Sequence, residues 1–393
     1  MTPTDAETAL AARIASAREP LLIRGAGTKS GMLRPVQAAE TISTAHLTGI
    51  TLYAPKELII SARAGTPLHE IEEALAEKGQ HLISEPPDLS LLLGTTPGTQ
   101  TLGGVVATNL SGPRRVAWGA TRDHVMGVRA VTGRGEVIHS GGRVLKNVTG
   151  LDLCKLLTGS HGTLGVITEV TLKVLPAPEA TGTILIPGLD AAAAVAALSA
   201  ALGSPYGVSG AAWLPAAAAA RLPEIAALGR AVALIRIEDF AASVIYRTEK
   251  LRGELGFPNA DILDDATSRA LWRGVRDAHA LPSGAEAVWR VSVRPSAGAG
   301  VLAAVPDVGA YLDWGGGLVW LAGPATEATH RAVEAASRAA GGVWTLMKAP
   351  DPLRGAVDVV PPEASPLARI TRRVKEAMDP RGLLNPGRIY AGL

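Results

Sequence analysis

The sequence predicts an α+β protein made of two folding units and a short closing segment. Apolar runs of strand length alternate with amphipathic helical segments along the whole chain. The composition changes at Pro176-Ala177-Pro178, after which alanine-rich helical segments begin. The chain has 393 residues, of which 47% are hydrophobic, and this is enough for two or three domains with cores of their own. We therefore expect one unit over residues 1–176, a second over 177–350, and a closing segment over 351–393.

Charge and cysteine content exclude several classes of partner and site. The formal net charge is +2, and the lysines and arginines are spread along the chain, so nothing indicates a nucleic-acid partner. The single cysteine, Cys154, rules out an intramolecular disulfide and a cysteine-ligated zinc site or cluster within this chain. One thiol and no disulfide fit a reducing compartment, so we expect the protein in the cytoplasm.

The N-terminal region and the longest apolar run give no sign of a secretory or membrane-spanning segment. Asp5 and Glu7 stand where a secretory signal would carry a basic region followed by an apolar core. The run over residues 189–202 is mostly alanine and is too short to span a bilayer. We expect any association with the inner face of a membrane to be peripheral and to depend on partners.

Apolar spacing and turn residues predict the elements of the first unit. Ala6, Leu10 and Ile14 share one face of a helix over residues 6–18, which ends before Pro20. Thr66 and Pro67 are expected to begin another helix, with Thr66 as its cap. The other predicted elements of this unit are the strands Leu21–Arg24, Leu58–Ala62 and Val166–Leu175, the hairpin Val125–Val131 with Glu136–His139, and the helix Leu151–Leu157.

The second unit is predicted to be an α+β domain of ferredoxin-like type, because its strands are separated by helices. The predicted helices are Ala191–Ala201, Ala216–Leu222, Ala241–Leu255 and Thr326–Ala340, and the predicted strands are Ala231–Ile237, Ala287–Val293 and Leu318–Ala322. A proline-rich linker over residues 350–366 then leads to a last amphipathic helix with Leu367, Ile370 and Val374 on one face. No internal repeat is evident in the sequence.

A glycine-containing turn, Arg24-Gly25-Ala26-Gly27-Thr28-Lys29-Ser30, follows the first predicted strand. It is not a P-loop, because Thr28 stands where that motif needs glycine, and it lacks the last glycine of the dinucleotide fingerprint, where Ser30 stands. What remains is a group of backbone N–H donors, with Lys29 and Ser30 as additional donors, suited to a pyrophosphate. The alternative is a plain glycine-rich turn.

Two further glycine-rich segments follow. Residues 94–109 carry glycines at 94, 98, 103 and 104 and continue as a helix of small residues, which is the outline of a phosphate cradle. The alternative for this segment is close packing of helices through small residues. In residues 150–168 the chain again changes direction at glycines next to a predicted strand, as in a cofactor-binding loop. The alternative for this segment is an ordinary helix-loop-strand connection.

In this order and spacing, the three segments resemble the FAD-binding domain of the vanillyl-alcohol oxidase family, also called the PCMH-type flavoproteins. Residues 378–388, Met-Asp-Pro-Arg-Gly-Leu-Leu-Asn-Pro-Gly-Arg, look like the C-terminal "DP-G-NPG" motif of that family. Within this family, the chain is most similar to the small flavin subunits of bacterial glycolate oxidases. This similarity lies in residues 111–115, 122–123 and 146–152. The resemblance covers nearly the whole chain.

The resemblance implies a PCMH-type FAD-binding domain of two subdomains, a ferredoxin-like cap domain, and a C-terminal segment that returns to the FAD site. It also implies an FAD-dependent oxidoreductase in which flavin accepts or relays electrons from a small 2-hydroxy acid. The implied partners are a larger flavin subunit and an iron–sulfur subunit. Members that bind flavin covalently place histidine in the first turn or add a cysteine, whereas this chain has Thr28 and Lys29 there, so dissociable FAD is expected.

Residue roles follow from the same resemblance. Amides of residues 25–30 and 98–101 would bind the pyrophosphate, and Arg388 or Lys146 would place positive charge near the flavin. The residues implied to contact FAD are Arg24, Gly25, Ala26, Gly27, Thr28, Lys29, Ser30, Pro97, Gly98, Thr99, Thr101, Gly103, Gly104, Thr108, Ser111, Gly162, Ile167, Asn385 and Arg388.

The second unit departs from the catalytic relatives. Those relatives carry a histidine-containing "GDGN" motif for metal and substrate, but residues 313–320 of this chain read Asp-Trp-Gly-Gly-Gly-Leu-Val-Trp, so we expect no metal site. Arg276 and Arg290 are candidates to bind a substrate carboxylate, and His161 is the histidine best placed for flavin chemistry. The alternatives are surface or partner-facing charge for the arginines and a supporting role for the histidine.

Three functions remain open from the sequence. The first is an FAD-binding subunit of a glycolate or D-2-hydroxy acid oxidase complex. The second is a self-sufficient FAD-dependent D-2-hydroxy acid or alcohol dehydrogenase that uses Arg276, Arg290 and His161. The third is a structural assembly subunit in which the flavin is incidental.

Overall fold

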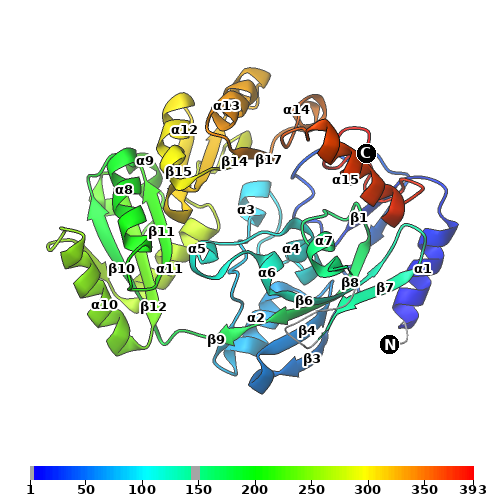
Figure 1. Ribbon diagram of the computed structural model, residues 1–393, viewed down its shortest axis with the longest axis horizontal. Helices are drawn as coiled ribbons and strands as arrows, with labels where there is room; N and C mark the ends of the chain where they lie inside the picture. The colour runs from blue at the N-terminus through cyan, green and yellow to red at the C-terminus, as the bar shows by residue number, and fades with distance from the viewer. Residues whose placement is uncertain (1–3, 143–150) are drawn as a thin grey trace. The chain divides into compact units, whose positions relative to one another are not determined.

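The computed structural model describes residues 4–142 and 151–393 (Figure 1). The chain forms two compact units, the first made of Met1–Leu110, Ala120–Ala177 and Pro362–Leu393, and the second of Ser111–Gly119 and Pro178–Pro361. The observed boundary after Ala177 lies one residue beyond the expected one, and the closing segment begins at Pro362, later than expected. Ser111–Gly119 belongs to the second unit, although no local pattern indicates this.

The first unit is built on a five-stranded antiparallel sheet with strand order β3-β4-β8-β6-β7. Its strands are β3 Ile50–Ala54, β4 Ile59–Arg63, β6 Val125–Val131, β7 Val137–Gly141 and β8 Val166–Lys173. Two small sheets pair β1 Leu21–Arg24 with β2 Glu40–Ser43 and β5 Gln80–His81 with β9 Leu175–Pro176. The helices are α1 Asp5–Ser16, α2 Leu68–Ala76, α3 Ser90–Leu93, α4 Leu102–Thr108, α6 Thr121–His124, α7 Leu153–Leu157 and α15 Ser365–Met378.

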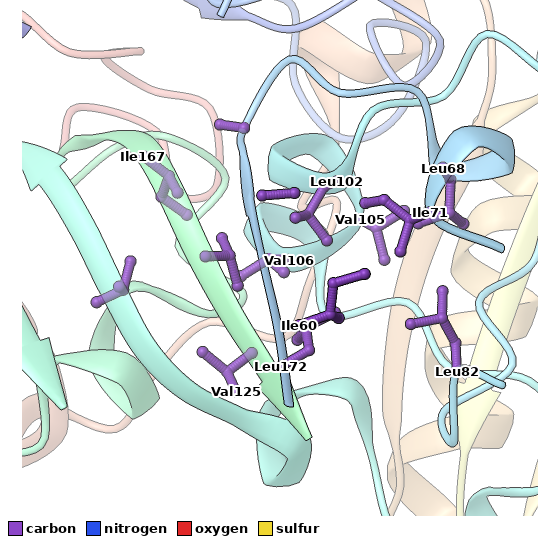
Figure 2. Close-up of a cluster of buried hydrophobic side chains, with 14 of the residues drawn as sticks. Ile60, Leu68, Ile71, Leu82, Leu102, Val105, Val106, Val125, Ile167 and Leu172 are labelled. Carbon is purple, nitrogen blue, oxygen red and sulfur yellow. The ribbon is translucent and has the colours of Figure 1, made fainter. Parts of the chain in front are cut away.

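Helices α2 and α4 pack on this sheet and form the main core of the unit (Figure 2). Leu102, Val105 and Val106 of α4 are almost completely buried, and Figure 2 shows them among side chains of β4 and β8. Gly103 N–H donates to the Ala64 carbonyl oxygen at 2.7 Å, and a Cβ on Gly103 would lie 2.7 Å from the Ala64 Cβ. This face of α4 is packed in the core. Gly104, Ala107 and Thr108 lie on the opposite face of the helix and are only partly buried.

A buried ion pair attaches α1 to the sheet. The Glu7 carboxylate accepts hydrogen bonds from Arg129 at 2.8 and 2.6 Å and from the Thr168 hydroxyl at 2.8 Å. Burial acts to raise the pKa of Glu7, but hydrogen bonds from Arg129, Thr4 and Thr168 outweigh it and lower this pKa from 4.5 to about 2. The carboxylate therefore stabilises the fold in its charged form.

We expect this pair to make the fold sensitive to acid. Since the folded-state pKa of Glu7 is depressed, its contribution is fully present above the unfolded value of 4.5 and is lost as the pH falls toward about 2. Glu7→Gln should lower stability at pH 7 and weaken the loss of stability between pH 4.5 and pH 2. Urea unfolding of both proteins across this range measures the effect. Equal pH slopes in the two proteins would contradict it.

The second unit contains an eight-stranded antiparallel sheet with strand order β13-β10-β12-β11-β15-β16-β14-β17. Its strands are β10 Ala180–Pro187, β11 Val208–Leu214, β12 Val232–Asp239, β13 Asp261–Leu263, β14 Ala287–Ser292, β15 Gly309–Asp313, β16 Leu318–Gly323 and β17 Val343–Lys348. Its helices are α5 Arg115–Trp118, α8 Ala191–Leu202, α9 Ala216–Ala219, α10 Ala241–Glu254, α11 Asp265–Arg276, α12 Gly298–Ala304, α13 Glu327–Ala339 and α14 Asp351–Ala356.

This sheet consists of two halves with the same connectivity. Strands β10 to β13 with α8 and α10, and strands β14 to β17 with α12 and α13, each run β-α-β-β-α-β, the connectivity of the ferredoxin-like motif. In each half the spatial order is fourth, first, third, second, and the halves join where Trp213 pairs with Leu312. The unit thus contains a structural duplication that has no evident counterpart in the sequence.

Five strands and four helices of this unit, the helices being α5, α11, α12 and α14, were not expected from the sequence, and one detail of α2 in the first unit differs from expectation. Strands β10, β11, β13, β15 and β17 were not predicted, and all seven residues of β11 are buried, so it has no alternation of polar and apolar residues. Pro67 occupies the N-cap position of α2 and makes no capping hydrogen bond. Thr66, the predicted cap, lies one residue earlier, and its hydroxyl donates to the Arg63 carbonyl oxygen. Leu367 and Ile370, which share one face of α15 as expected, are 51% and 57% exposed. Within the described residues, no helix is both long and apolar enough to cross a membrane.

Candidate cofactor site

A cleft in the first unit brings together the glycine-rich segments that are far apart in the sequence. Its empty volume is about 790 Å³, part of which is open to solvent. Fifteen of the residues expected to contact FAD line it: Arg24, Gly25, Ala26, Gly27, Thr28, Lys29, Ser30, Thr101, Gly103, Gly104, Thr108, Gly162, Ile167, Asn385 and Arg388. His161 also lines it.

The turn after β1 fits closely against the start of α4. A Cβ on Gly25 would lie 2.4 Å from the Thr101 Oγ1, so only glycine allows this approach. Gly27 has a φ of +84°, which also favours glycine. Thr101 caps α4, and its hydroxyl oxygen accepts a hydrogen bond from the Gly104 N–H at 3.4 Å. The two segments therefore form one continuous wall of the cleft.

The C-terminal segment closes the other side through Asn385. Its Oδ1 accepts from the Ile23 N–H at 2.7 Å, and its Nδ2 donates to the carbonyl oxygens of Ile23 and His161 at 3.2 and 2.8 Å. Gly162 has a φ of +73°, and a Cβ there would lie 2.8 Å from the Asn385 Nδ2. Asn385 thereby joins β1, the 161–162 turn and the C-terminal segment.

Arg388 connects the same C-terminal segment to the first glycine-rich turn. Its guanidinium donates to the carbonyl oxygens of Lys29, Ser30 and Arg34 at 3.0, 3.3 and 2.9 Å. This residue is 91% buried within the fold, so solvent screens its charge less than it would screen an exposed one. Arg388 both shapes the turn and makes the cleft more positive.

The electrostatics of the cleft favour an anion. Burial lowers the pKa of Lys29 to about 8, although the Asp88 carboxylate acts to raise it, and the Lys29 Nζ donates to the Gln100 Oε1 at 3.0 Å. Burial, with a smaller effect of Arg388, lowers the pKa of His161 to about 3, so its imidazole is neutral near pH 7. Among the described residues that line the cleft, none carries a carboxylate. Backbone donors, Lys29 and Arg388 therefore suit a diphosphate.

Helix α4 supplies a surface for a flat ring. Gly104, Ala107 and Thr108 line the cleft from the face of α4 opposite its core residues. A Cβ on Gly104 would meet only the Thr101 Oγ1, at 3.3 Å, and would otherwise enter open space. The missing side chain at Gly104 thus widens the cleft, whereas the one missing at Gly103 permits packing on Ala64.

Four expected FAD contacts lie outside the cleft. The Gly98 N–H donates to the Asp88 Oδ2 at 2.7 Å, so it is already used within the fold, and Pro97 and Thr99 belong to the same outer turn. Ser111 is buried in the second unit. Of residues 98–101, whose amides were expected to bind the pyrophosphate, Thr101 lines the cleft, whereas residues 98–100 do not.

The remaining candidates lie in the second unit or outside the described residues. The Arg276 guanidinium donates to both carboxylate oxygens of Asp277 at 2.8 Å, so it is committed to an ion pair. Arg290 stacks on tryptophan side chains. Lys146, residues 147–149 and Gly150, the first residue of the third segment, lie outside the described residues.

Six residues of the cleft were not anticipated: Leu22, Ile23, Thr44, Ala107, Gly165 and Val166. Ala107 lies three residues after Gly104, so helical spacing from that glycine could have identified it. Leu22 and Ile23 belong to β1, which was predicted, and their place follows from the bridge between Leu21 and Leu384. Nothing in the sequence around Thr44 marks it as part of a site.

A family profile described as "FAD binding domain" matches residues 2–141, which include two of the three glycine-rich segments. The chain is 34% identical to glycolate oxidase subunit GlcE of Escherichia coli (strain K12), over 96% of this chain and 95% of that protein. It is also 34% identical to glycolate oxidase subunit GlcD of Bacillus subtilis (strain 168), over 45% of this chain and 36% of that protein. Among solved structures, alkyldihydroxyacetonephosphate synthase matches with a TM-score of 0.66 at 17% identity, covering 93% of this chain and 72% of that one, which shows a shared fold.

Fold, cleft and profile together define an FAD-binding oxidoreductase of the PCMH type. More specifically, the chain belongs to the family of glycolate oxidase subunit GlcE, because the similarity extends over nearly the full length of both proteins.

Proposed function

We propose that this chain is the FAD-binding subunit of a glycolate oxidase-type complex that acts on D-2-hydroxy acids. The observation that carries the proposal is the similarity to subunit GlcE over 96% of the chain, which is not confined to the FAD-binding domain. Bound FAD supplies the ability to accept electrons from a substrate and pass them to an acceptor. In this proposal the chain accepts or relays electrons, and partner subunits complete catalysis.

The cleft residues have distinct proposed roles toward FAD. The amides of residues 25–30, together with Lys29, bind the diphosphate, because they supply donors and charge without a competing carboxylate. Gly104 and Thr108 lie along the flavin ring, and Asn385 holds the surrounding segments in place. Binding is non-covalent, since Thr28 and Lys29 occupy the first turn and the buried Cys154 lies in α7.

The lowered pKa of His161 favours a partner subunit as the source of the base that abstracts a proton from the substrate. A general base works best when its pKa lies near the working pH. The pKa of His161 is lowered to about 3, so its neutral ring has little tendency to take up a proton at pH 7. We propose that His161 helps to shape the cleft, with its carbonyl oxygen bound to Asn385.

The proposed partners are a larger flavin subunit and an iron–sulfur subunit. Two relatives named as different subunits of glycolate oxidase, GlcE and GlcD, are both similar to this chain, which supports a complex of related flavin subunits. We place the complex in the cytoplasm, with any contact with the membrane made through partners.

The proposal is tested by anaerobic mixing of the FAD-loaded chain with glycolate or D-lactate. We expect the flavin absorbance of the isolated chain to persist, because His161, whose pKa is lowered to about 3, is a poor general base at pH 7. We expect the chain co-expressed with its two partners to reduce a dye with these substrates, and the complex without this chain to lose that activity. Bleaching of the isolated chain at the rate of the complex would instead identify a self-sufficient dehydrogenase, and a fully active complex without this chain would contradict the proposal.

A further inference from the structure

The first unit contains a second hollow that is separate from the FAD cleft. Its empty volume is about 910 Å³, part of which is open to solvent. It is lined by residues of α15, drawn in red in Figure 1, of the 156–164 segment and of the C-terminal segment. Ser160 and Thr163 line this hollow, whereas His161 and Gly162, from the same turn, line the FAD cleft. The proposed cofactor site therefore gives this hollow no role.

The surface of the hollow suits an apolar group. The hydroxyls of Thr158, Ser160 and Thr163 donate to backbone carbonyl oxygens at 2.7, 2.8 and 2.7 Å. The other polar side chains that line the hollow and belong to the described residues are also bonded within the fold: Glu363, Thr371, Lys375 and Tyr390. A polar ligand would have to replace existing hydrogen bonds, whereas an apolar side chain would not.

Helix α15 carries an apolar stripe beside this hollow. Leu367, Ile370 and Val374 follow the i, i+3, i+7 spacing by which one helix packs on another. Ile370 and Val374 line the hollow, and Leu367 and Ile370 are more than half exposed. Neighbouring exposed apolar side chains of this size indicate an interaction surface. We call the hollow and these three side chains the α15 groove.

The charge beside the α15 groove is positive. Arg369 and Arg373 are four residues apart on one side of the stripe, and Arg373 follows Ile370 by three residues. Both arginines are exposed, and neither forms an ion pair with a residue that the structure describes. Arg372 is exposed too, and Glu376 is the only acidic residue of α15. A partner with carboxylates next to its apolar side chains would complement this surface.

We propose that the α15 groove binds an acidic amphipathic helix of a partner subunit. Apolar residues of that helix pack on the stripe, one of them fills the hollow, and carboxylates beside them meet Arg369 and Arg373. A bilayer surface matches the groove less well, because it has no side chain to fill a hollow. This inference rests on the proposed function for the existence of partner subunits, and it adds the surface and the chemistry by which one of them is held.

The inference is tested by titrating each purified partner subunit onto the immobilised, FAD-loaded chain at low and high salt. Ile370→Glu should weaken binding of one subunit by about tenfold or more, because it places a charge in an apolar contact. Arg373→Glu should weaken it by about tenfold and reduce its dependence on salt. The matched control is Arg372→Glu, which makes the same change of charge on the side of α15 opposite the stripe and should weaken binding less than about threefold.

FAD content and thermal unfolding are measured for every variant, and both should match wild type because the three positions are exposed. Binding that is unchanged in Ile370→Glu and Arg373→Glu, or weakened equally in Arg372→Glu, would overturn the inference and leave the proposed function standing. Failure of the wild-type chain to bind either subunit would contradict the proposed partners as well. Binding to phosphatidylserine-containing vesicles that Ile370→Glu abolishes, with assembly of the subunits unchanged, would overturn the inference in favour of a membrane surface.

Discussion

Gly104→Leu is expected to abolish FAD binding while leaving the fold intact. Gly104 lines the cleft, and a side chain there would enter the space assigned to the flavin. We expect FAD affinity at least about a hundredfold weaker, equal to about 3 kcal/mol. The apo protein should be no less stable than wild type, because leucine favours a helix over glycine by up to about 1 kcal/mol. Fluorescence titration with FAD and thermal unfolding of the apo protein measure the two effects.

The adjacent glycine provides a control with the opposite signature. A Cβ on Gly103 would lie 2.7 Å from the Ala64 Cβ and 2.9 Å from its carbonyl oxygen, and the latter belongs to the backbone and cannot move away. Gly103→Ala should therefore destabilise the protein by about 1–3 kcal/mol. Gly104→Ala should weaken FAD binding less than Gly104→Leu does. Wild-type FAD affinity in Gly104→Leu would show that the flavin does not lie along α4.

Lys375→Met is expected to cause the largest loss of stability among the variants considered. The Lys375 Nζ donates to the Asp379 Oδ2 at 2.8 Å and to the carbonyl oxygens of Thr163 and Leu384 at 2.7 and 2.9 Å. Lys375 and Asp379 are 6% and 1% exposed. Removing the ammonium leaves a buried carboxylate without its counter-charge, which costs about 3–5 kcal/mol. Urea unfolding measures this loss, and FAD affinity should fall with it because Asn385 and Arg388 lie in the segment held by these bonds.

Two further variants separate the ion pair from other effects of substitution on α15. Lys375→Met combined with Asp379→Asn should be more stable than the sum of the single losses predicts, because the charge and its partner are removed together. Arg372→Gln, at an exposed position of the same helix, should change stability by no more than about 0.5 kcal/mol. A Lys375→Met protein as stable as Arg372→Gln would show that the pair does not hold the C-terminal segment.

Most of the residues that line the cleft were predicted from the sequence, but six of them were not, and residues 97–99 were expected there and lie outside it. Short-range signals identified the turn at Arg24–Ser30 and the start of α4, because a missing Cβ at Gly25 and Gly104 is visible in the sequence itself. Residues 97–99 do not line the cleft, because the Gly98 N–H donates to Asp88, a long-range contact that no local pattern shows. Thr44 was missed for the same reason.

The second unit shows where local patterns are insufficient. Strand β11 was missed because both its faces are buried, and the duplication of the sheet became visible only through its strand order. Lys375 has the spacing of an exposed i,i+4 pair with Asp379, and only the contacts with Thr163 and Leu384 identify it as buried. Arg276 and Arg290 looked equivalent in the sequence, but Asp277 pairs with the first, whereas Trp314 and Trp320 surround the second.

The most direct test of the central claim is the flavin content of the purified chain before and after acid precipitation, compared with that of Gly104→Leu. Non-covalent FAD in the cleft of the first unit predicts equimolar FAD in the wild-type chain after reconstitution, with all of it released into the supernatant. The Gly104→Leu protein should be folded and colourless. A wild-type chain that takes up no FAD, flavin that remains in the precipitate, or a Gly104→Leu protein with full flavin content would contradict the claim.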